Sequence, residues 1–371
     1  MEERCFTQAG LSEKYPELLQ LKNVRQNPDY HAEGDVYRHT EMVCEKLLLL
    51  PEWYGLTFEE QRILFFAAAF HDIGKITCTK QEDGKWVSPG HTKAGEKIFR
   101  GLAYRENRRF DLNIREREKV AKLIRYHGLP VWFWTRRRPE AALLMAAESV
   151  SLRLLYLLAK ADVQGREGSD MGSLDDNVEL FADFAKELGI WQSPYQFAGP
   201  YAKFQYFHRE DMWQGTELYD DTEFDVILLS GLPLAGKDSW IAEHGQDMAV
   251  VSLDDIREER GISPEEGSGR VVCEAVERAR IFLRRKEPFI WNATNIIQET
   301  RQKLVRLFAG YGARVCILYL EAPYQELLER NQKRERHIPE AVLEKMIRRL
   351  ELPEPWEAYE VKCLFAGAEE R

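Results

Sequence analysis

The chain of 371 residues is long enough for two or three domains. Its formal net charge of −10 argues against a protein that coats nucleic acid by bulk charge. No apolar run reaches membrane-spanning length, and the first residues lack the apolar core of a signal peptide. The six cysteines form no C-x-x-C pair, which argues against a disulfide framework or a thiolate zinc site. We therefore expect a cytoplasmic protein without a membrane partner.

Helical patterns fill the chain from residue 1 to about 168. Thr57 and Glu60 predict a capping box at the start of an apolar run that ends at His71. Further helices are expected over residues 39–50, 115–127 and 139–162, the last as one helix with Pro139 in its first turn. No strand pattern competes with them, so residues 1–168 are predicted to form an all-α domain.

The pattern alternates from about residue 223 to the end. Short apolar runs predict strands, and longer amphipathic stretches between them predict helices. This alternation is typical of an α/β domain, residues 223–371, with a parallel sheet covered by helices on both faces. Residues 169–222 form a connector with one helix and an aromatic-rich segment, which we expect to pack between the domains. The strands are expected at residues 224–230, 248–253, 288–292 and 313–320.

Four histidines and two aspartates of the helical half are candidate metal ligands. His71 and Asp72 are adjacent at the end of an apolar helix, where two ionisable groups are costly unless they are paired. Imidazole with carboxylate suits one or two transition metal ions such as Mn, Ni, Co or Fe better than Mg²⁺. Two such ions can activate water and clamp a phosphoester oxygen. The full set is His39, His71, Asp72, His91, His127 and Asp162.

These motifs resemble a known family. "RHT", "FHDIGK", "GHTKAG", "YH" and "KADVQGR" are similar to the HD superfamily of metal-dependent phosphohydrolases over about residues 30–168. Lys75, about one turn beyond the His-Asp pair, is placed to contact a phosphate oxygen and is a candidate catalytic residue. The resemblance implies that one ion is held by His39, His71, Asp72 and Asp162, and that a second is served by His91 and His127.

The stretch "GLPLAGKDSW", residues 231–240, fits the phosphate-binding pattern G-x-x-x-x-G-K-[ST] except at its last place. Gly231 and Gly236 would let backbone amides turn toward phosphate oxygens, and Lys237 would reach the β- and γ-phosphates of ATP. Asp238 stands where a hydroxyl usually holds Mg²⁺, and it would bind Mg²⁺ directly or through water. Ser239 completes the predicted ATP site but points about 100° away on a helix, so it does not replace that hydroxyl.

Polar residues after the next two predicted strands are candidates for the acceptor side. Asp254 lies at the carboxyl edge of the sheet, where a carboxylate can accept a proton from an attacking hydroxyl. Arg257 follows three residues later and can grip a phosphate. Asn292 occupies the place where many such sheets have a magnesium-linked aspartate, and Asn292 and Asn295 can hydrogen-bond the acceptor or the loop.

Arg330 and Arg334 lie four residues apart, so a helix would present both on one face above the ATP phosphates, where they would stabilise charge in phosphoryl transfer. The motifs "GKDSW", "LDDIR", "NATN…TR" and "RNQKR…IPEAVLEKM" resemble the 5′-hydroxyl polynucleotide kinase family of P-loop proteins over residues 224–359. The resemblance implies that Asp254 is the general base, that Arg257 contacts the acceptor strand, and that the two arginines belong to a lid over ATP.

The order of the two domains is similar to that of the bacterial two-domain HD–polynucleotide kinase enzymes, which heal broken RNA ends. This resemblance implies 5′-OH phosphorylation, removal of 2′,3′-cyclic or terminal phosphates, and a separate RNA ligase. The partners would be RNA or DNA strand ends and ATP or another NTP. The segment "YHGLPVWFWTRRRP" is a candidate RNA contact or a hydrophobic plug. Two alternatives stay open: an HD nucleotide phosphohydrolase with a small-molecule kinase, and a regulatory ATP-binding switch.

Overall fold

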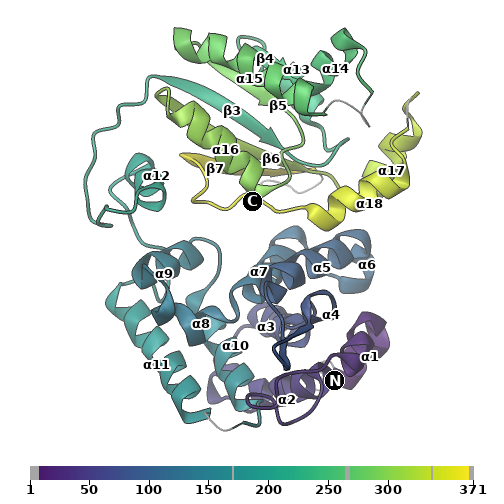
Figure 1. Cartoon of the computed structure of the whole chain (residues 1–371), viewed down its shortest axis with the longest axis vertical. Coiled ribbons are helices and arrows are strands. Elements are labelled where there is room, and N and C mark those ends of the chain that lie inside the picture. The colour runs from purple at the N-terminus through teal and green to yellow at the C-terminus, as the bar shows by residue number, and fades with distance from the viewer. Residues whose placement is uncertain (1–7, 169–170, 264–267, 336, 367–371) are drawn as a thin grey trace. The chain divides into compact units, whose positions relative to one another are not determined.

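The computed structural model describes residues 8–168, 171–263, 268–335 and 337–366. The chain forms two compact units, residues 1–195 and 196–371. The first consists mainly of helices, and the second is a sheet with helices on its faces (Figure 1).

Helices form the frame of the first unit. The capping box of Thr57 and Glu60 is present, and Asn113 forms a second one with Glu116. The α-helices are α1 (Gln8–Lys14), α2 (Val36–Leu49), α3 (Phe58–Phe70), α4 (Lys75–Cys78), α5 (His91–Arg105), α6 (Asn107–Phe110), α7 (Ile114–Tyr126), α8 (Leu129–Trp132), α9 (Pro139–Ala147), α10 (Leu152–Gln164) and α11 (Met171–Glu187), and the 3₁₀ helices are η2 (Pro16–Asn23), η3 (Pro51–Gly55) and η4 (Phe133–Thr135).

Two expectations for this unit are wrong in detail. The single helix predicted over 139–162 is two helices, α9 and α10, which meet at a bend of 112°. Ser151 starts the second helix because its hydroxyl accepts the Leu154 amide. A short hairpin, β1 (Lys80–Glu82) and β2 (Lys85–Val87), interrupts the helices.

No single helix in the described part of the chain is long and apolar enough to cross a membrane. The bent pair α9–α10 meets that test by length and composition only.

The second unit is built on a parallel five-stranded sheet in the order β4-β5-β3-β6-β7. The four predicted strands are confirmed, and β7 at one edge was not predicted. The strands are β3 (Phe224–Ser230), β4 (Ala249–Ser252), β5 (Phe289–Asn292), β6 (Ala313–Glu321) and β7 (Glu360–Phe365); the helices are α12 (Pro200–His208), α13 (Lys237–His244), α14 (Leu253–Arg260), α15 (Ser268–Arg285), α16 (Gln298–Ala309), α17 (Tyr324–Gln332) and α18 (Glu340–Arg349).

Helices cover both faces of this sheet, as the alternation predicts (Figure 1). Side chains alternate along β3: Val226 and Leu228 pack with α15 and α16, whereas Ile227 and Leu229 pack on the side of α13. Phe204 of α12 joins the α15–α16 core, so the aromatic stretch of the predicted connector contributes to the second unit. The central position of β3 places the loop that follows it in the middle of the sheet's carboxyl edge.

Candidate active sites

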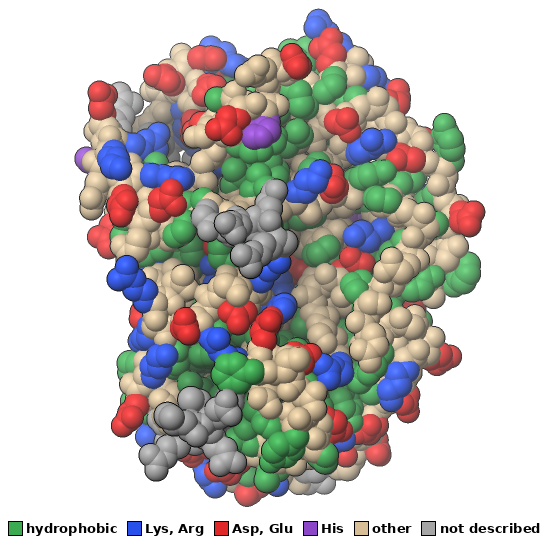
Figure 2. Space-filling view, turned by 180° about the vertical axis from the view of Figure 1, so that it is seen from behind, with side chains coloured by type: hydrophobic (Ala, Val, Ile, Leu, Met, Phe, Trp, Pro, Cys, Tyr) green, Lys and Arg blue, Asp and Glu red, His purple; other side chains and the backbone are tan. Residues whose placement is uncertain are grey.

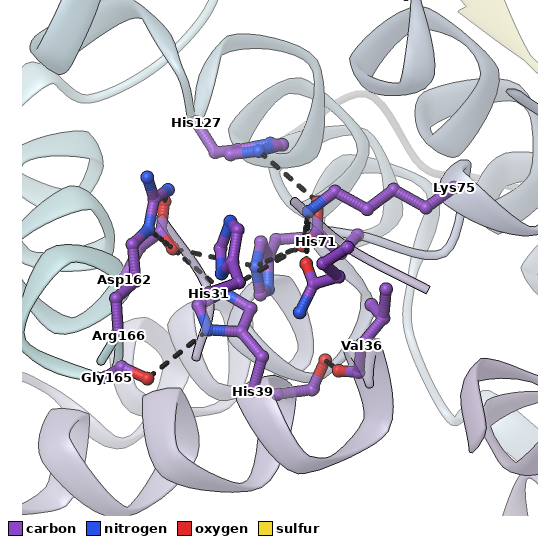
Figure 3. A network of polar contacts seen from close by, with 12 residues as sticks. His31, Val36, His39, His71, Lys75, His127, Asp162, Gly165 and Arg166 are labelled. Carbon is purple, nitrogen blue, oxygen red and sulfur yellow. Dashed lines mark hydrogen bonds and ion pairs between the residues drawn. The ribbon is translucent and has the colours of Figure 1, made fainter. Parts of the chain in front are cut away.

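The first unit gathers all six predicted metal ligands. His39 lies within α2, Asp162 lies within α10, and His91 begins α5. His71 and Asp72 follow the end of α3, and His127 follows the end of α7. His91 is half-buried and the other five are buried. Figure 3 shows His39, His71, His127 and Asp162 converging on one centre. Helix ends thus bring together residues that are far apart in the sequence.

A hydrogen bond at Nδ1 orients each of the four imidazole rings. The Nδ1 atom of each ring faces a backbone carbonyl, at 2.7 Å for His71 with Ala68, 2.8 Å for His91 with Ser88 and 2.9 Å for His127 with Ile124. In His39 the Nδ1 atom lies 3.0 Å from the Glu33 carboxylate and 3.3 Å from the Gly165 carbonyl, the second of which is drawn in Figure 3. An Nδ1–H that donates to a carbonyl leaves Nε2 unprotonated, which is the form that binds a metal ion.

The ligand atoms form two groups of three. His39, His71 and Asp162 make one group and Asp72, His91 and His127 the other, and within each group the atoms lie within 4.8 Å of one another. Asp72 links the groups, since its Oδ2 is 3.3 Å from His71 Nε2 and its Oδ1 is 3.5 Å from His91 Nε2. Asp72 Oδ2 also lies 3.9 Å from His39 Nε2, so the set of His39, His71, Asp72 and Asp162 that the family resemblance implies is compatible with this geometry. Two neighbouring groups are the arrangement that two ions require.

The chemistry of these atoms fits a metal centre. His71 Nε2 and Asp72 Oδ1 are buried without a hydrogen-bond partner among the described residues, which is costly unless a ligand satisfies them. Burial lowers the pKa of His127 to about 3. Burial opposes ionisation of Asp72, yet the Lys75 ammonium and His71 hold the pKa of this carboxyl well below its usual range. Burial opposes protonation of His39, yet its hydrogen bonds with Asp162 and Glu33 raise the pKa of this imidazole, so a metal ion would compete there with a proton. Imidazole beside ionised carboxylate is the donor set that transition metals bind.

Lys75 and a fifth histidine, His31, border this cluster. Lys75 Nζ lies 2.7 Å from Asp72 Oδ2 and donates to Gln26 Oε1 at 2.8 Å. His31, which sequence reasoning missed, pairs with Glu33 at 2.7 Å, and together with His39 these residues form a third possible ligand group. His31 lies in an irregular segment without periodicity, so no sequence signal marks it.

The loop after β3 has the backbone that phosphate binding requires. Gly231 has φ +147°, and a Cβ there would come within 2.3 Å of the Leu320 carbonyl oxygen, so no other residue fits. Gly236 and Leu234 also have positive φ, at +104° and +68°. The Leu234 conformation is the left-handed one that glycine adopts without strain. The loop ends directly at Lys237, the first residue of α13, whose N-terminus favours anions.

Two cations surround this loop. Lys237 Nζ donates to the carbonyls of Gly231 at 3.2 Å and Leu232 at 2.8 Å. Burial lowers the pKa of Lys237 to about 8, although Asp238 and Asp254 favour its charged form. Arg330 of α17 donates to the Leu234 carbonyl at 2.6 Å, which places a guanidinium beside the loop.

The predicted magnesium and acceptor residues lie at the same edge of the sheet. Asn292, the last residue of β5, donates its amide to the Asp238 carboxylate at 2.9 Å. Asp254 lies in the first turn of α14, close enough to Lys237 to act on its pKa. Arg257, one turn later, donates to the Ser263 carbonyl at 3.4 Å. Two carboxylates, those of Asp238 and Asp254, thus lie near the Lys237 ammonium.

Other predicted residues have different surroundings from those expected. Arg334 does not share a helix face with Arg330, because α17 ends at Gln332 and Arg334 lies exposed beyond it. Asn295 is buried and its amide donates to the Leu229 carbonyl at 2.6 Å. Ser239 is exposed. In the aromatic run, Phe133 is the buried plug, whereas Trp132 is 44% exposed.

Comparisons with known proteins match part of each unit. A family model described as HD domain matches residues 36–157, and one described as AAA domain matches residues 226–353. The chain is similar to the multifunctional CCA proteins of Pasteurella multocida (29% identity; 48% of this chain and 39% of the relative) and Hahella chejuensis (30%; 43% and 36%). It is also similar to the L-seryl-tRNA(Sec) kinase of Methanococcus maripaludis, with 27% identity over 34% of this chain and 53% of the relative.

The chain thus spans between about a third and about half of the length of these relatives. It contains an HD domain within a helical region, followed by a P-loop domain of the AAA type on a parallel five-stranded sheet.

Proposed function

We propose that this chain heals broken RNA ends with two activities. The P-loop unit would phosphorylate a 5′-OH end with ATP, and the HD unit would remove a 2′,3′-cyclic or terminal phosphate. The observation that carries the proposal is that one chain gathers six candidate metal ligands in one unit and, in the other, places the Asp254 carboxylate near the lysine of a P-loop.

In the HD unit, the protein supplies a rigid ligand set and a cation. Divalent ions, when bound, would activate water and polarise the phosphoester oxygens. Backbone carbonyls, and for His39 also the Glu33 carboxylate, already orient the four imidazoles, so little reorganisation is needed for binding. Lys75, held between Asp72 and Gln26, would donate to an oxygen of the phosphate as negative charge develops on it.

In the P-loop unit, Asp254 would accept the proton of the 5′-OH as its oxygen attacks the γ-phosphorus. The new O–P bond forms as the bond between the γ-phosphorus and the β,γ-bridging oxygen breaks, and ADP leaves with that electron pair. Lys237 and Arg330 would stabilise the charge on the transferred group. Asp238 and Asn292 would hold Mg²⁺, and Arg257 would position the acceptor phosphate.

Two further observations support an RNA acceptor. One relative is an L-seryl-tRNA(Sec) kinase, by name a kinase with a tRNA-linked substrate. On the face shown in Figure 2, basic and acidic side chains are interspersed. Binding of a strand end through local sites, rather than along a broad basic track, fits this distribution and the net charge of −10. Healed ends are substrates for a ligase, which we expect as a separate protein.

The test uses an RNA that carries a 5′-OH and a 2′,3′-cyclic phosphate. The RNA is incubated with ATP and Mg²⁺, Mn²⁺ or Ni²⁺, and its ends are resolved by electrophoresis. Wild type should phosphorylate the 5′ end and open or remove the cyclic phosphate. Lys237→Met should abolish only the first reaction, and Asp72→Ala only the second.

Two results would contradict the proposal. If both reactions persist in both variants, the assigned sites are wrong. If mononucleotides displace the RNA from both sites, the protein is a nucleotide-metabolising enzyme instead.

A further inference from the structure

A cavity opens beside the metal cluster within the first unit. Its volume is about 480 Å³, and Lys75 and His91 form the part of its wall that belongs to the cluster. A cavity of this size accommodates a nucleotide, whereas inorganic phosphate would fill a small part of it. The remaining lining is Gln26, Asn27, Tyr30, His31, Glu82, Trp86, Val87, Ser88, Pro89, Trp132 and Arg166.

One polar side chain in the cavity wall has an unused donor. Gln26 is 8% exposed, and its Oε1 accepts a hydrogen bond from Lys75 at 2.8 Å. Its Nε2 is buried and has no hydrogen-bond partner among the residues that the structure describes. A buried amide donor without an acceptor is unfavourable, so a ligand oxygen at this position would be stabilised.

Cations lie on both sides of the cluster at the cavity. Lys75 is on the side of Gln26, and Arg166 pairs with Asp162 across the cluster (Figure 3). Arg166 is half-buried and also lines the cavity. The wall of the cavity thus carries three donor side chains, Gln26, Lys75 and Arg166, that could bind phosphate oxygens.

Aromatic side chains form another part of the wall. Trp86 lies on β2, and the guanidinium of Arg25 lies 5.7 Å from its ring centroid. Tyr30 and Trp132 line the same cavity and are 43% and 44% exposed, which is unusual for such large rings. Exposed aromatic faces beside cations stack nucleic-acid bases without regard to sequence.

We propose that this cavity is a subsite for the terminal nucleoside of a strand that ends in a 3′ or cyclic phosphate. Gln26, Lys75 and Arg166 take the phosphate oxygens, and Trp86 with Tyr30 and Trp132 stacks the base. The inference rests on the proposed phosphatase activity of the HD unit and adds its substrate class: a nucleotide end of any base, in preference to a simple phosphoester.

The first experiment compares two substrates in the presence of Mn²⁺: adenosine 2′,3′-cyclic phosphate and bis(p-nitrophenyl) phosphate. Trp86→Ala should raise KM for the nucleotide by about tenfold, because a stacking surface is lost, and leave kcat within about twofold. The same variant should change kcat/KM for the nitrophenyl ester by less than about twofold. Trp134→Ala is the control. Trp134 lies two residues after Trp132 and is 51% exposed, but it does not line the cavity.

The second experiment measures binding without turnover. Binding of adenosine 3′-monophosphate to the metal-free chain is measured by calorimetry for wild type, Trp86→Ala, Gln26→Ala and Trp134→Ala. Wild type and Trp134→Ala should bind equally, and the other two variants should bind about tenfold more weakly. Hydrogen exchange of peptides that cover α3 and α10, which should match wild type in every variant, reports that the first unit is folded.

The two measurements separate the two hypotheses. If wild type does not bind the nucleotide, or if Trp86→Ala binds it as wild type does, the subsite is wrong even when hydrolysis occurs. If wild type binds the nucleotide in a Trp86-dependent way but hydrolyses neither ester with any metal, the subsite stands and the proposed phosphatase activity fails.

Discussion

The Asn292 amide donates a hydrogen bond to the Asp238 carboxylate at 2.9 Å, across the end of β5 and the first turn of α13. P-loop proteins commonly hold Mg²⁺ between a hydroxyl in the loop and an aspartate on a neighbouring strand. Here a carboxylate occupies the loop position and a neutral amide the strand position. The contact shows that the two side chains are neighbours, so the proposed magnesium site would have its carboxylate on α13 in place of β5.

Because the carboxylate and the amide have exchanged places, we expect a carboxylate at position 292 to compensate for the loss of the one at position 238. Asp238→Ser leaves two neutral groups, and we expect kinase activity to persist but to require about tenfold more Mg²⁺ for half-maximal rate. Asp238→Ser with Asn292→Asp restores one carboxylate and should return the Mg²⁺ dependence to within about threefold of wild type. A Mg²⁺ titration of the kinase rate at saturating ATP measures both. A double variant no better than the single one would show that the Asp238 carboxylate has a role of its own.

The buried ammonium of Lys237 predicts how ATP binding depends on pH. Burial lowers its pKa to about 8, and the polyphosphate favours the charged form. Below pH 8 the group is already protonated and affinity should be constant. Above pH 8 ATP must bind together with a proton, so affinity should fall by up to about tenfold per pH unit. Calorimetry from pH 7 to 9.5 tests this, with Lys237→Met as the control that should bind weakly and lack the dependence. A flat wild-type profile would contradict the prediction.

Local signals in the sequence identify most elements of the fold. The apolar run from Phe224 to Ser230 coincides with β3 because a buried central strand is continuously apolar. Strand β7 was not predicted because it lies at the edge of the sheet, is partly exposed and carries charged residues, so it forms no continuous apolar run. The hairpin β1–β2 does have a signal: Asp83 and Gly84 both adopt positive φ, as an Asp-Gly turn allows.

Some of the site residues can also be identified from the sequence, and others cannot. His71 and Asp72 stand out because an ionisable pair ends an apolar helix, and the structure surrounds them with the other predicted ligands. Gln26, His31 and Trp86 lie in irregular or hairpin segments, and only the tertiary fold brings them to the cavity. Single side chains of ordinary residue types carry no periodicity, so their roles depend on contacts that the sequence does not display.

The two ligand groups predict a stoichiometry of two divalent ions. Replacing both His91 and His127 by alanine removes two of the three ligands of one group and leaves His39, His71 and Asp162 intact. Wild type should retain two Mn²⁺ or Ni²⁺ ions after equilibrium dialysis, and the double variant one, as measured by mass spectrometry of the metal. Added metal should raise the Tm of wild type more than that of the variant.

His244→Ala is the control for this measurement, since His244 lies in α13 and belongs to neither ligand group. It should leave the stoichiometry at two. Equal metal content in the double variant and wild type would show that the second group holds no ion.

A buried ion pair in the second unit predicts a large loss of stability. Arg301 of α16 and Glu357 are both fully buried, and Arg301 makes two hydrogen bonds of 2.8 Å to the carboxylate. Glu357→Gln leaves the guanidinium without its counter-charge and should lower the free energy of unfolding of this unit by about 3–5 kcal/mol. Glu299→Gln, which removes the charge from an exposed pair with Lys303 on the same helix, should cost less than about 0.5 kcal/mol. Hydrogen exchange of peptides that cover β3 measures both effects, and similar protection in the two variants would show that the buried pair contributes no more than the exposed one.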